Sequence, residues 1–188
     1  MVDLIDTVGE GSTSQDAVFM RLALEMAQQA ADADEVPVGA VLVNAQGEIV
    51  GRGANAVLRR CDPSAHAEIM AMREAGLALN NYRLPDLTLY VTLEPCTMCL
   101  GAIFHARIAR LVYGASDPKT GACGGRLDLT EKGLINYHCE IEGGVLAEDC
   151  AKMLTRFFSQ RRQRQAEKKR IEQQRAEQET IPQNPAKS

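Results

Sequence analysis

Residues 87–106 read LTLYVTLEPCTMCLGAIFHA, a strand pattern followed directly by a helix pattern. Its first part, Leu87–Leu93, is rich in β-branched and aromatic residues and predicts a strand that ends at Glu94-Pro95. A helix is expected from Thr97 to about Ala106. Cys96 and Cys99 would then lie where a strand ends and a helix begins.

The flanking sequence continues this alternation of strands and helices. We expect a helix from Ser14, a hairpin of strands 38–43 and 48–53, a helix from Asp62-Pro63-Ser64 to about Ala75, a strand at 108–113, a loop at 114–127, a weak strand at 140–142 and a final helix from about Ala147. Such an order implies an α/β layered domain around a central sheet.

Composition indicates one globular domain with trailing sequence. The chain has 188 residues, of which 45% are hydrophobic and 4% aromatic, so a sizeable aliphatic core can form. No apolar run is long enough to span a membrane, and the N-terminus lacks the pattern of a secretory signal. The six cysteines do not resemble a disulfide framework. We therefore expect a cytoplasmic protein.

The two ends of the chain differ from its centre. Residues 1–13 are polar, without periodicity, and are expected to be disordered; residues 14–160 would form the domain, and 161–188 a basic helical and then disordered tail. The net charge is −4, yet residues 156–188 hold nine Lys or Arg against four Glu. This asymmetry is typical of a basic tail that binds a polyanion, and equally of a solvated, charged helix end.

Two short segments carry the candidate chemistry: Ala65-His66-Ala67-Glu68 and Pro95-Cys96-Thr97-Met98-Cys99. Cysteines three residues apart at a helix start can share a metal ion, and the helix dipole there favours the thiolate. One imidazole and two thiolates leave a fourth tetrahedral position for water, which is the layout of a catalytic zinc site. Glu68 is placed to exchange protons with that water.

Simpler readings apply to each segment alone. A Cys-x-x-Cys pair also occurs in structural zinc sites and in redox motifs, and His105, His138 or Cys123 could supply a fourth structural ligand. A His-x-Glu pair is also found at ordinary helix starts. The occurrence of both segments, each at a predicted helix start in an α/β pattern, favours catalytic zinc. Together they match the zinc-deaminase signature of His-x-Glu and Pro-Cys-x-x-Cys.

Longer segments extend the match. Roughly residues 15–160 resemble the bacterial tRNA-specific adenosine deaminases, which belong to the zinc-dependent cytidine and deoxycytidylate deaminase superfamily. The segments that carry this resemblance are 35–41 (EVPVGAV), Asn55, 62–70 (DPSAHAEIM), 82–84 (YRL), 89–99 (LYVTLEPCTMC) and 114–121 (GASDPKTG).

The resemblance implies a three-layer α/β/α cytidine-deaminase-like fold with a central five-stranded mixed sheet. It also implies hydrolytic deamination of adenosine to inosine at the wobble position of a tRNA anticodon. The enzyme would be a homodimer that binds the anticodon stem-loop and holds one Zn²⁺ per subunit.

The resemblance also assigns roles to residues. His66, Cys96 and Cys99 would hold the zinc, and Glu68 would transfer protons. Among the substrate-binding residues, Asn55 would read the edge of the flipped purine and Val38 would line the base pocket. Asp117 lies in a segment that approaches the sugar and backbone, and Lys119 could reach a phosphate.

Other functions stay open from the residues alone. A deaminase of a free nucleobase, nucleoside or nucleotide, such as cytidine, deoxycytidylate or guanine, would use the same zinc site. A non-catalytic nucleic-acid-binding module could keep zinc for structure only, although it would have no use for Glu68. An interaction protein that acts through its basic tail is a third possibility.

Overall fold

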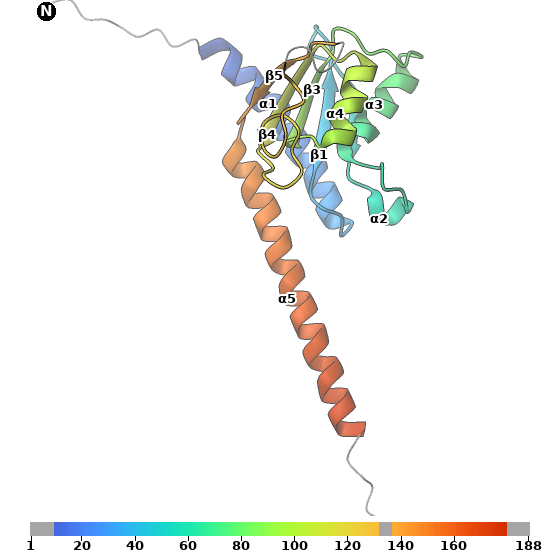
Figure 1. The fold of residues 1–188 in the computed structure, drawn as a ribbon, viewed down its shortest axis with the longest axis vertical. Helices are drawn as coiled ribbons and strands as arrows, with labels where there is room; N and C mark the ends of the chain where they lie inside the picture. Colours follow the sequence, from blue (N-terminus) through green and yellow to red (C-terminus); the bar gives the residue numbers. More distant parts are fainter. Residues whose placement is uncertain (1–9, 132–136, 180–188) are drawn as a thin grey trace, which may run out of the picture. The chain divides into compact units, whose positions relative to one another are not determined.

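The computed structural model describes residues 10–131 and 137–179. Their elements, in chain order, are α1 (Glu10–Asp32), β1 (Gly39–Val43), β2 (Ile49–Ala54), α2 (Val57–Arg60), α3 (Ala67–Ala78), β3 (Thr88–Leu93), α4 (Thr97–Ala106), β4 (Arg110–Ala115), β5 (Glu140–Gly143) and α5 (Ala147–Glu179) (Figure 1). The chain divides between Leu154 and Thr155 into two compact units.

The strands form one mixed sheet in the order β2-β1-β3-β4-β5. β1 pairs antiparallel with both β2 and β3, whereas β3, β4 and β5 run parallel. The hairpin of β1 and β2 and the parallel half therefore meet between β1 and β3. This arrangement confirms the expected five-stranded mixed sheet.

Alternate residues of the strands face two separate cores, as the period of two in a strand requires. On β1, Ala40 and Leu42 belong to the core that also holds α3 and α4, whereas Val41 and Val43 belong to the core beneath α1. Figure 1 shows α3 and α4 on one face of the sheet and α1 on the other. The domain thus has the expected three layers, with both faces of the sheet buried.

Gly53 of β2 brings one helix unusually close to the sheet. A β-carbon at this position would collide with the carbonyl oxygen of Ala67, at the first turn of α3, and would crowd the amide nitrogen of Ala71. The missing side chain lets the α3 backbone lie directly on the strand. The height of α3 above the sheet is therefore set by backbone contact.

Two helix starts differ from the sequence-based expectation. α1 begins at Glu10, inside the segment 1–13 expected to be disordered, because extending a helix that already packs well costs little even through weak helix formers. Residues 1–9 lie outside the described residues. α3 begins only at Ala67, because Asp62 accepts hydrogen bonds from the amide and hydroxyl of Ser64 and closes a local turn before the helix.

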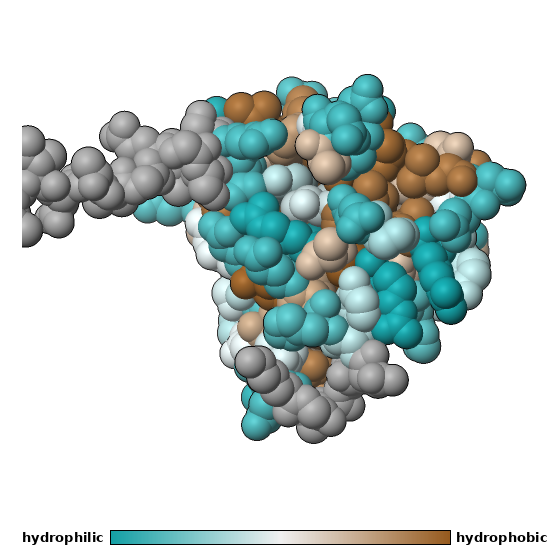
Figure 2. Space-filling view, turned by 90° about the horizontal axis from the view of Figure 1, so that it is seen from above, coloured by the Kyte–Doolittle hydropathy of each residue, from teal (hydrophilic) through white to brown (hydrophobic). Residues whose placement is uncertain are grey.

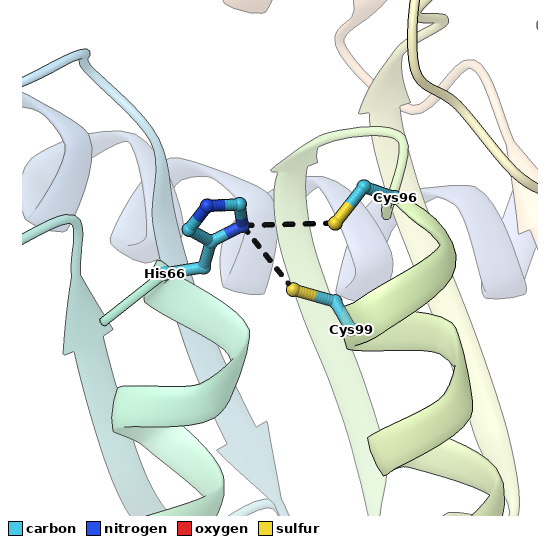
Figure 3. A group of neighbouring side chains, drawn as sticks. All are labelled: His66, Cys96 and Cys99. Carbon is cyan, nitrogen blue, oxygen red and sulfur yellow. Dashed lines mark hydrogen bonds between the residues drawn. The ribbon is translucent and has the colours of Figure 1, made fainter. Parts of the chain in front are cut away.

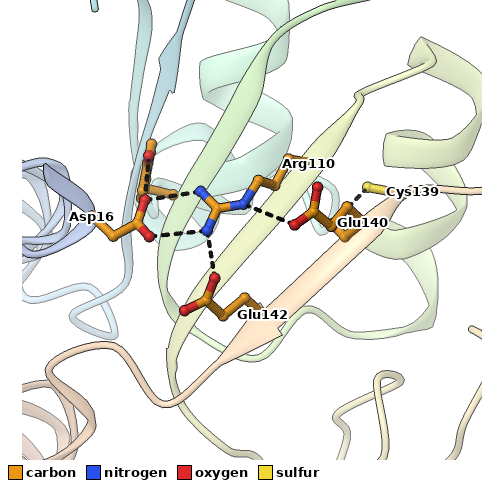
Figure 4. Close-up of polar contacts among 6 residues, drawn as sticks. Asp16, Arg110, Cys139, Glu140 and Glu142 are labelled. Atoms are coloured by element: carbon orange, nitrogen blue, oxygen red, sulfur yellow. Dashed lines mark hydrogen bonds and ion pairs between the residues drawn. The ribbon is translucent and has the colours of Figure 1, made fainter. Parts of the chain in front are cut away.

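An ion-pair network joins α1 to the parallel half of the sheet (Figure 4). Both guanidinium NH₂ groups of Arg110 on β4 donate to Asp16 on α1, at 2.8 and 2.9 Å, and Tyr90 Oη donates to the same carboxylate at 2.7 Å. Arg110 also contacts Glu140 and Glu142 on β5. Residues that are far apart in the sequence are therefore fixed to one another through a single arginine.

α5 continues as one helix across the boundary between the two units. From Gln160 to Gln174 nearly every side chain is exposed, in agreement with the lack of an apolar face in this part of the sequence. The end of the expected tail, 180–188, lies outside the described residues. In the described part of the chain, no helix has both the length and the apolar character that crossing a membrane requires.

Candidate metal centre and catalytic site

Two helix starts place the candidate ligands. His66 precedes α3 and Cys96 precedes α4, each with extended backbone angles, φ −74° and ψ 156° or 173°. Neither side chain caps its own helix, so both are available for another partner. Glu68 and Cys99 follow in the first turns of the two helices. The short turn before each helix, rather than the helix itself, thus orients the first ligand.

The three expected ligand side chains converge (Figure 3). His66 Nδ1 lies 3.7 Å from Cys96 Sγ and 3.4 Å from Cys99 Sγ. At the zinc–nitrogen and zinc–sulfur distances usual in proteins, a tetrahedral site separates such a pair by about 3.6 Å. The donor atoms are therefore spaced for one zinc ion per subunit.

No side chain that the structure describes adds a fourth ligand to this group. Within residues 15–131 and 137–174, whose side chains are described, His66, Cys96 and Cys99 form the only cluster of three or more potential ligands. His105, His138 and Cys123, which could have completed a structural site, do not take part. An open fourth position fits a catalytic site.

The two thiols share a hydrogen bond that separates their acidities. The hydrogen bond from Cys99 lowers the pKa of Cys96 to about 4, and His66 adds to this effect. The same pairing and burial raise the pKa of Cys99. The lowered pKa of Cys96 favours the thiolate, which is the form that binds zinc, and Cys99 has to lose its proton when the metal binds.

Glu68 stands beside the ligands without joining them. Its side chain is buried, with 4% exposure. Burial raises the pKa of this carboxyl above its usual value, and the Cys99 thiol is close enough to hydrogen-bond to it. A buried carboxyl next to an open metal position is suited to carry protons to and from the reacting water and substrate.

Asn55 connects β2 to the start of α3. Its Oδ1 accepts a hydrogen bond of 2.9 Å from the Ala67 amide, and so takes the capping role that the His66 side chain leaves open. Its backbone amide donates to Val38 O at 3.1 Å. With Oδ1 occupied, the Nδ2 group is the part of Asn55 that remains to donate to a ligand. Val38 is buried in the core beside α3.

Asp117 and Lys119 lie in the loop after β4, and the structure gives them different surroundings. Asp117 accepts hydrogen bonds from the amides of Lys119 and Thr120 and from the Thr120 hydroxyl, so its carboxylate organises the turn. The Lys119 side chain is exposed. No described side chain links either residue directly to the three ligands.

Glu94 is a polar residue of this region that sequence reasoning did not assign to the site. It is buried, with 2% exposure, and precedes Cys96 by two positions. Burial alone would raise its pKa, but hydrogen bonds from Asp117, Gly125, Ser116 and Cys123 outweigh burial and hold the pKa below its usual value. A glutamate directly before Pro-Cys was the available signal.

Comparison with known proteins agrees with this geometry. Residues 13–115 match the protein family described as the cytidine and deoxycytidylate deaminase zinc-binding region. The chain is 52% identical over 157 residues to the tRNA-specific adenosine deaminase of Haemophilus influenzae, which covers 84% of this chain and 88% of that protein. It is 42% identical over 159 residues to the tRNA-specific adenosine deaminase of Bacillus subtilis, covering 84% of this chain and 98% of that protein.

A solved structure from studies of A-to-I editing by tRNA deaminases at the wobble position of transfer RNA has the same fold. It superposes with a TM-score of 0.70 at 44% identity and covers 73% of this chain and 99% of that one. The group of His66, Cys96 and Cys99, the buried Glu68 beside it and the layered fold occur together with this level of identity. The chain therefore belongs to the cytidine and deoxycytidylate deaminase zinc-binding family and, within it, to the tRNA-specific adenosine deaminases.

Proposed function

We propose that this protein hydrolyses adenosine to inosine at the wobble position of a tRNA anticodon. The observation that carries the proposal is the buried Glu68 beside three ligands spaced for one zinc ion, in a chain 52% identical to a tRNA-specific adenosine deaminase. His66, Cys96 and Cys99 would hold the metal. Bound zinc supplies the Lewis acidity that makes water reactive at neutral pH.

Glu68 performs the proton transfers. It accepts a proton from the water whose oxygen adds to C6 of the adenine ring, and it delivers a proton to the ring nitrogen. It then takes the proton of the hydroxyl now on C6 and passes it to the amine, which departs as ammonia as the C6 carbonyl of inosine forms. Its burial next to the ligands supports this role, because a carboxyl shielded from bulk water exchanges protons with the reactants rather than with solvent.

Asn55 and Val38 form the base-reading part of the proposed site. The Asn55 carbonyl is fixed on the start of α3, so its Nδ2 donates to an acceptor on the purine edge. Val38, directly before β1, supplies apolar surface for the ring. The target base has to be unpaired and turned out of its stack to reach them, and the bases of an anticodon loop are already accessible.

The nucleic-acid contacts would come from the loop after β4 and from α5. Lys119 is exposed in a turn that Asp117 organises, and it would pair with a phosphate. The second unit carries Arg161, Arg162 and Arg164 on an exposed helix, and such a helix adds electrostatic attraction to an RNA backbone. These contacts support the anticodon stem-loop as the part of the tRNA that is bound.

A homodimer is the proposed assembly. A groove of about 1030 Å³ lies over α3 and α4 and includes Ile69, Leu77 and Tyr82 in its lining. Leu77 and Tyr82 are exposed to 84% and 74%, which is unusual for large apolar side chains on one surface. Figure 2 shows hydrophobic surface on the side where α3 and α4 lie in Figure 1. A second copy of this chain would cover it.

Sequencing of treated tRNA tests the proposed reaction. The zinc-loaded protein is incubated with a total bacterial tRNA pool, and reverse transcription then reports every position at which adenosine is read as guanosine. We expect one strong signal at a wobble adenosine. An unchanged pool would reject the proposal and favour the alternative, a deaminase of free cytidine, deoxycytidylate or guanine, which ammonia release from those compounds would detect.

A further inference from the structure

The Glu94 carboxylate lies at the centre of the loop that follows β4. Its Oε2 accepts hydrogen bonds from Ser116 Oγ and the Asp117 amide, both at 2.8 Å. Its Oε1 accepts from the amides of Cys123 and Gly125, at 2.9 and 2.8 Å. All four partners are donors, and they come from both ends of the segment 116–125. One buried carboxylate therefore closes this segment on itself.

The loop backbone is packed tightly onto that carboxylate. A β-carbon at Gly121 or at Gly125 would collide with the Glu94 carboxyl group and with the carbonyl oxygen of Asp117. The two glycines thus allow a close approach that other residues would prevent. The shape of the segment depends on a small, charged acceptor at its centre.

The same segment is joined to the backbone at a metal ligand. Cys96 and Gly121 form an antiparallel β-bridge, and the Ala122 amide donates to Pro95 O at 2.9 Å. Glu94, Pro95 and Cys96 are consecutive, so the loop is held by the side chain of the first and by the backbone of the next two. The segment that carries Asp117 and Lys119 is therefore built onto the turn that presents Cys96.

We propose that Glu94 is a positioning residue that holds the segment 116–125, defined here as the substrate loop, in the conformation that receives RNA. This inference rests on the proposed function, because it takes the loop as an RNA-binding element. Glu94 would not touch the substrate. It would raise the population of the closed loop, and the apparent affinity for RNA falls in proportion when that population falls.

Glu94→Gln tests whether the loop is held by the hydrogen-bond acceptors of Glu94 or only by the volume of its side chain. The amide has nearly the same size, but its NH₂ group would face a backbone N–H in either orientation, because each carboxylate oxygen accepts from at least one amide. Ser116→Ala is a milder variant that removes only one of the four hydrogen bonds. Asp16→Asn is the matched control, because Asp16 is another buried, multiply bonded carboxylate that belongs to the network of α1 and β4.

Alkylation of cysteines reports loop opening without any need for activity. Because the Glu94 charge also raises the pKa of Cys123, faster labelling is ascribed to opening only if Ser116→Ala, which keeps that charge, accelerates it in the same direction. Cys123 is half-buried in the substrate loop and donates its amide to Glu94, whereas Cys61 is exposed and provides an internal reference. In the zinc-loaded protein we expect iodoacetamide to modify Cys123 about tenfold faster after Glu94→Gln, as the open form rises from about one tenth of the molecules to most of them. The Cys61 rate should not change. Asp16→Asn should leave the ratio of the two rates unchanged.

Steady-state kinetics on tRNA separate positioning from a structural role. For Glu94→Gln we expect one zinc ion per chain, a KM raised about tenfold and a kcat within about threefold of the original. Ser116→Ala should raise KM in the same direction by a smaller factor. Asp16→Asn should lower thermal stability while leaving KM unchanged.

The experiments distinguish a failure of the role proposed for Glu94 from a failure of the proposed function. If Cys123 stays protected in folded, zinc-loaded Glu94→Gln, or if the loss falls on zinc content and kcat with KM unchanged, Glu94 does not position the loop. If Glu94→Gln does not fold, Ser116→Ala decides the matter: unchanged labelling and KM would overturn the inference. If the unaltered protein does not edit tRNA, the proposed function fails, while the labelling rates still report whether Glu94 holds the loop.

Discussion

Two buried glutamates near the metal ligands are suited to different roles because their hydrogen bonds differ. Four donors surround Glu94 and hold its pKa below the usual value, so it is a fixed negative charge. Burial dominates at Glu68 and raises its pKa, which suits a group that gains and loses a proton. Local environments that shift the pKa values of two carboxyl groups in opposite directions commonly give the two groups different roles.

Glu68→Gln is expected to abolish turnover without removing the metal. The amide fills the same volume but cannot accept a proton, and a positioned general acid–base contributes about 10²- to 10⁴-fold to rate. Inosine formation in tRNA and the zinc content measure the two effects. Glu74→Gln, an exposed position on the same helix, is the control and should keep full activity. Activity above one tenth of the original would contradict the role assigned to Glu68.

The structure brings together the three predicted ligands, with Glu68 beside them, because the spacing of each pair places both residues at one helix start. The proton-transfer role of Glu68 stays a prediction. The sequence did not predict Glu94, since its partners lie 22 to 31 residues further on. The structure brings Asn55 to the start of α3, next to His66. The substrate-binding roles of Asn55, Val38, Asp117 and Lys119 stay predictions.

At the scale of elements, strong local patterns predicted the strands and longer helices, and their boundaries were less well predicted. The expected start of α3 was wrong because a side-chain turn at Asp62 competes with the helix. α2 is a single short turn, and no sequence pattern predicted it because it has no apolar periodicity. No local sequence pattern predicted the ion-pair network around Arg110 either, because this network joins residues 94 positions apart.

Asp16→Asn is expected to destabilise the attachment of α1, most strongly at neutral pH. The hydrogen bond from Arg110 holds the Asp16 pKa below its usual value, with Tyr90 contributing in the same direction. The charge therefore stabilises the fold above pH ~4, and this contribution is lost as the pH falls through the lower pKa of the folded state. We expect a loss of about 3 kcal/mol at pH 7, since removing one member of a buried ion pair leaves the other charge unbalanced.

Urea unfolding of both proteins across this pH range measures the effect. The difference between them should shrink as the pH drops below ~4, where the unfolded state takes up the proton, and should be lost below the lower pKa of the folded state, where Asp16 is protonated in both states. Lys152→Gln is the control, since Lys152 belongs to an exposed ion pair with Glu148 and should leave stability nearly unchanged. A difference that is constant with pH would mean that the charge of Asp16 is not what stabilises the contact.

At the scale of the whole molecule, assembly is the property least accessible to sequence patterns. Leu77 and Tyr82 fit an ordinary helix and loop, and only the structure shows that they share one exposed apolar groove on α3 and α4. The resemblance to the tRNA-specific adenosine deaminases implied a homodimer, but no residue pattern indicated which surface is used. The groove is lined mostly by the later parts of these two helices, whereas the metal ligands lie at their starts.

Leu77→Asp is expected to dissociate the proposed dimer while the chain stays folded. The side chain is 84% exposed within one chain, so the change costs little in folding, whereas a charge in the interface replaces apolar burial and should weaken association by about 100-fold or more. Sedimentation velocity gives the mass. Val18→Asp, at an exposed apolar position on α1, is the control and should stay dimeric. A Leu77→Asp variant that sediments as a dimer would place the interface elsewhere.

The contact between Gly53 and the first turn of α3 makes the metal site sensitive to substitution of a residue in the sheet. Ala67, on which a β-carbon at Gly53 would impinge, follows the ligand His66 and precedes Glu68. Lifting that turn would move the imidazole away from two thiolates that belong to another helix. In a library of variants screened only for zinc retention, substitutions at Gly53 should be tolerated as poorly as substitutions of the ligands, although Gly53 does not bind the metal.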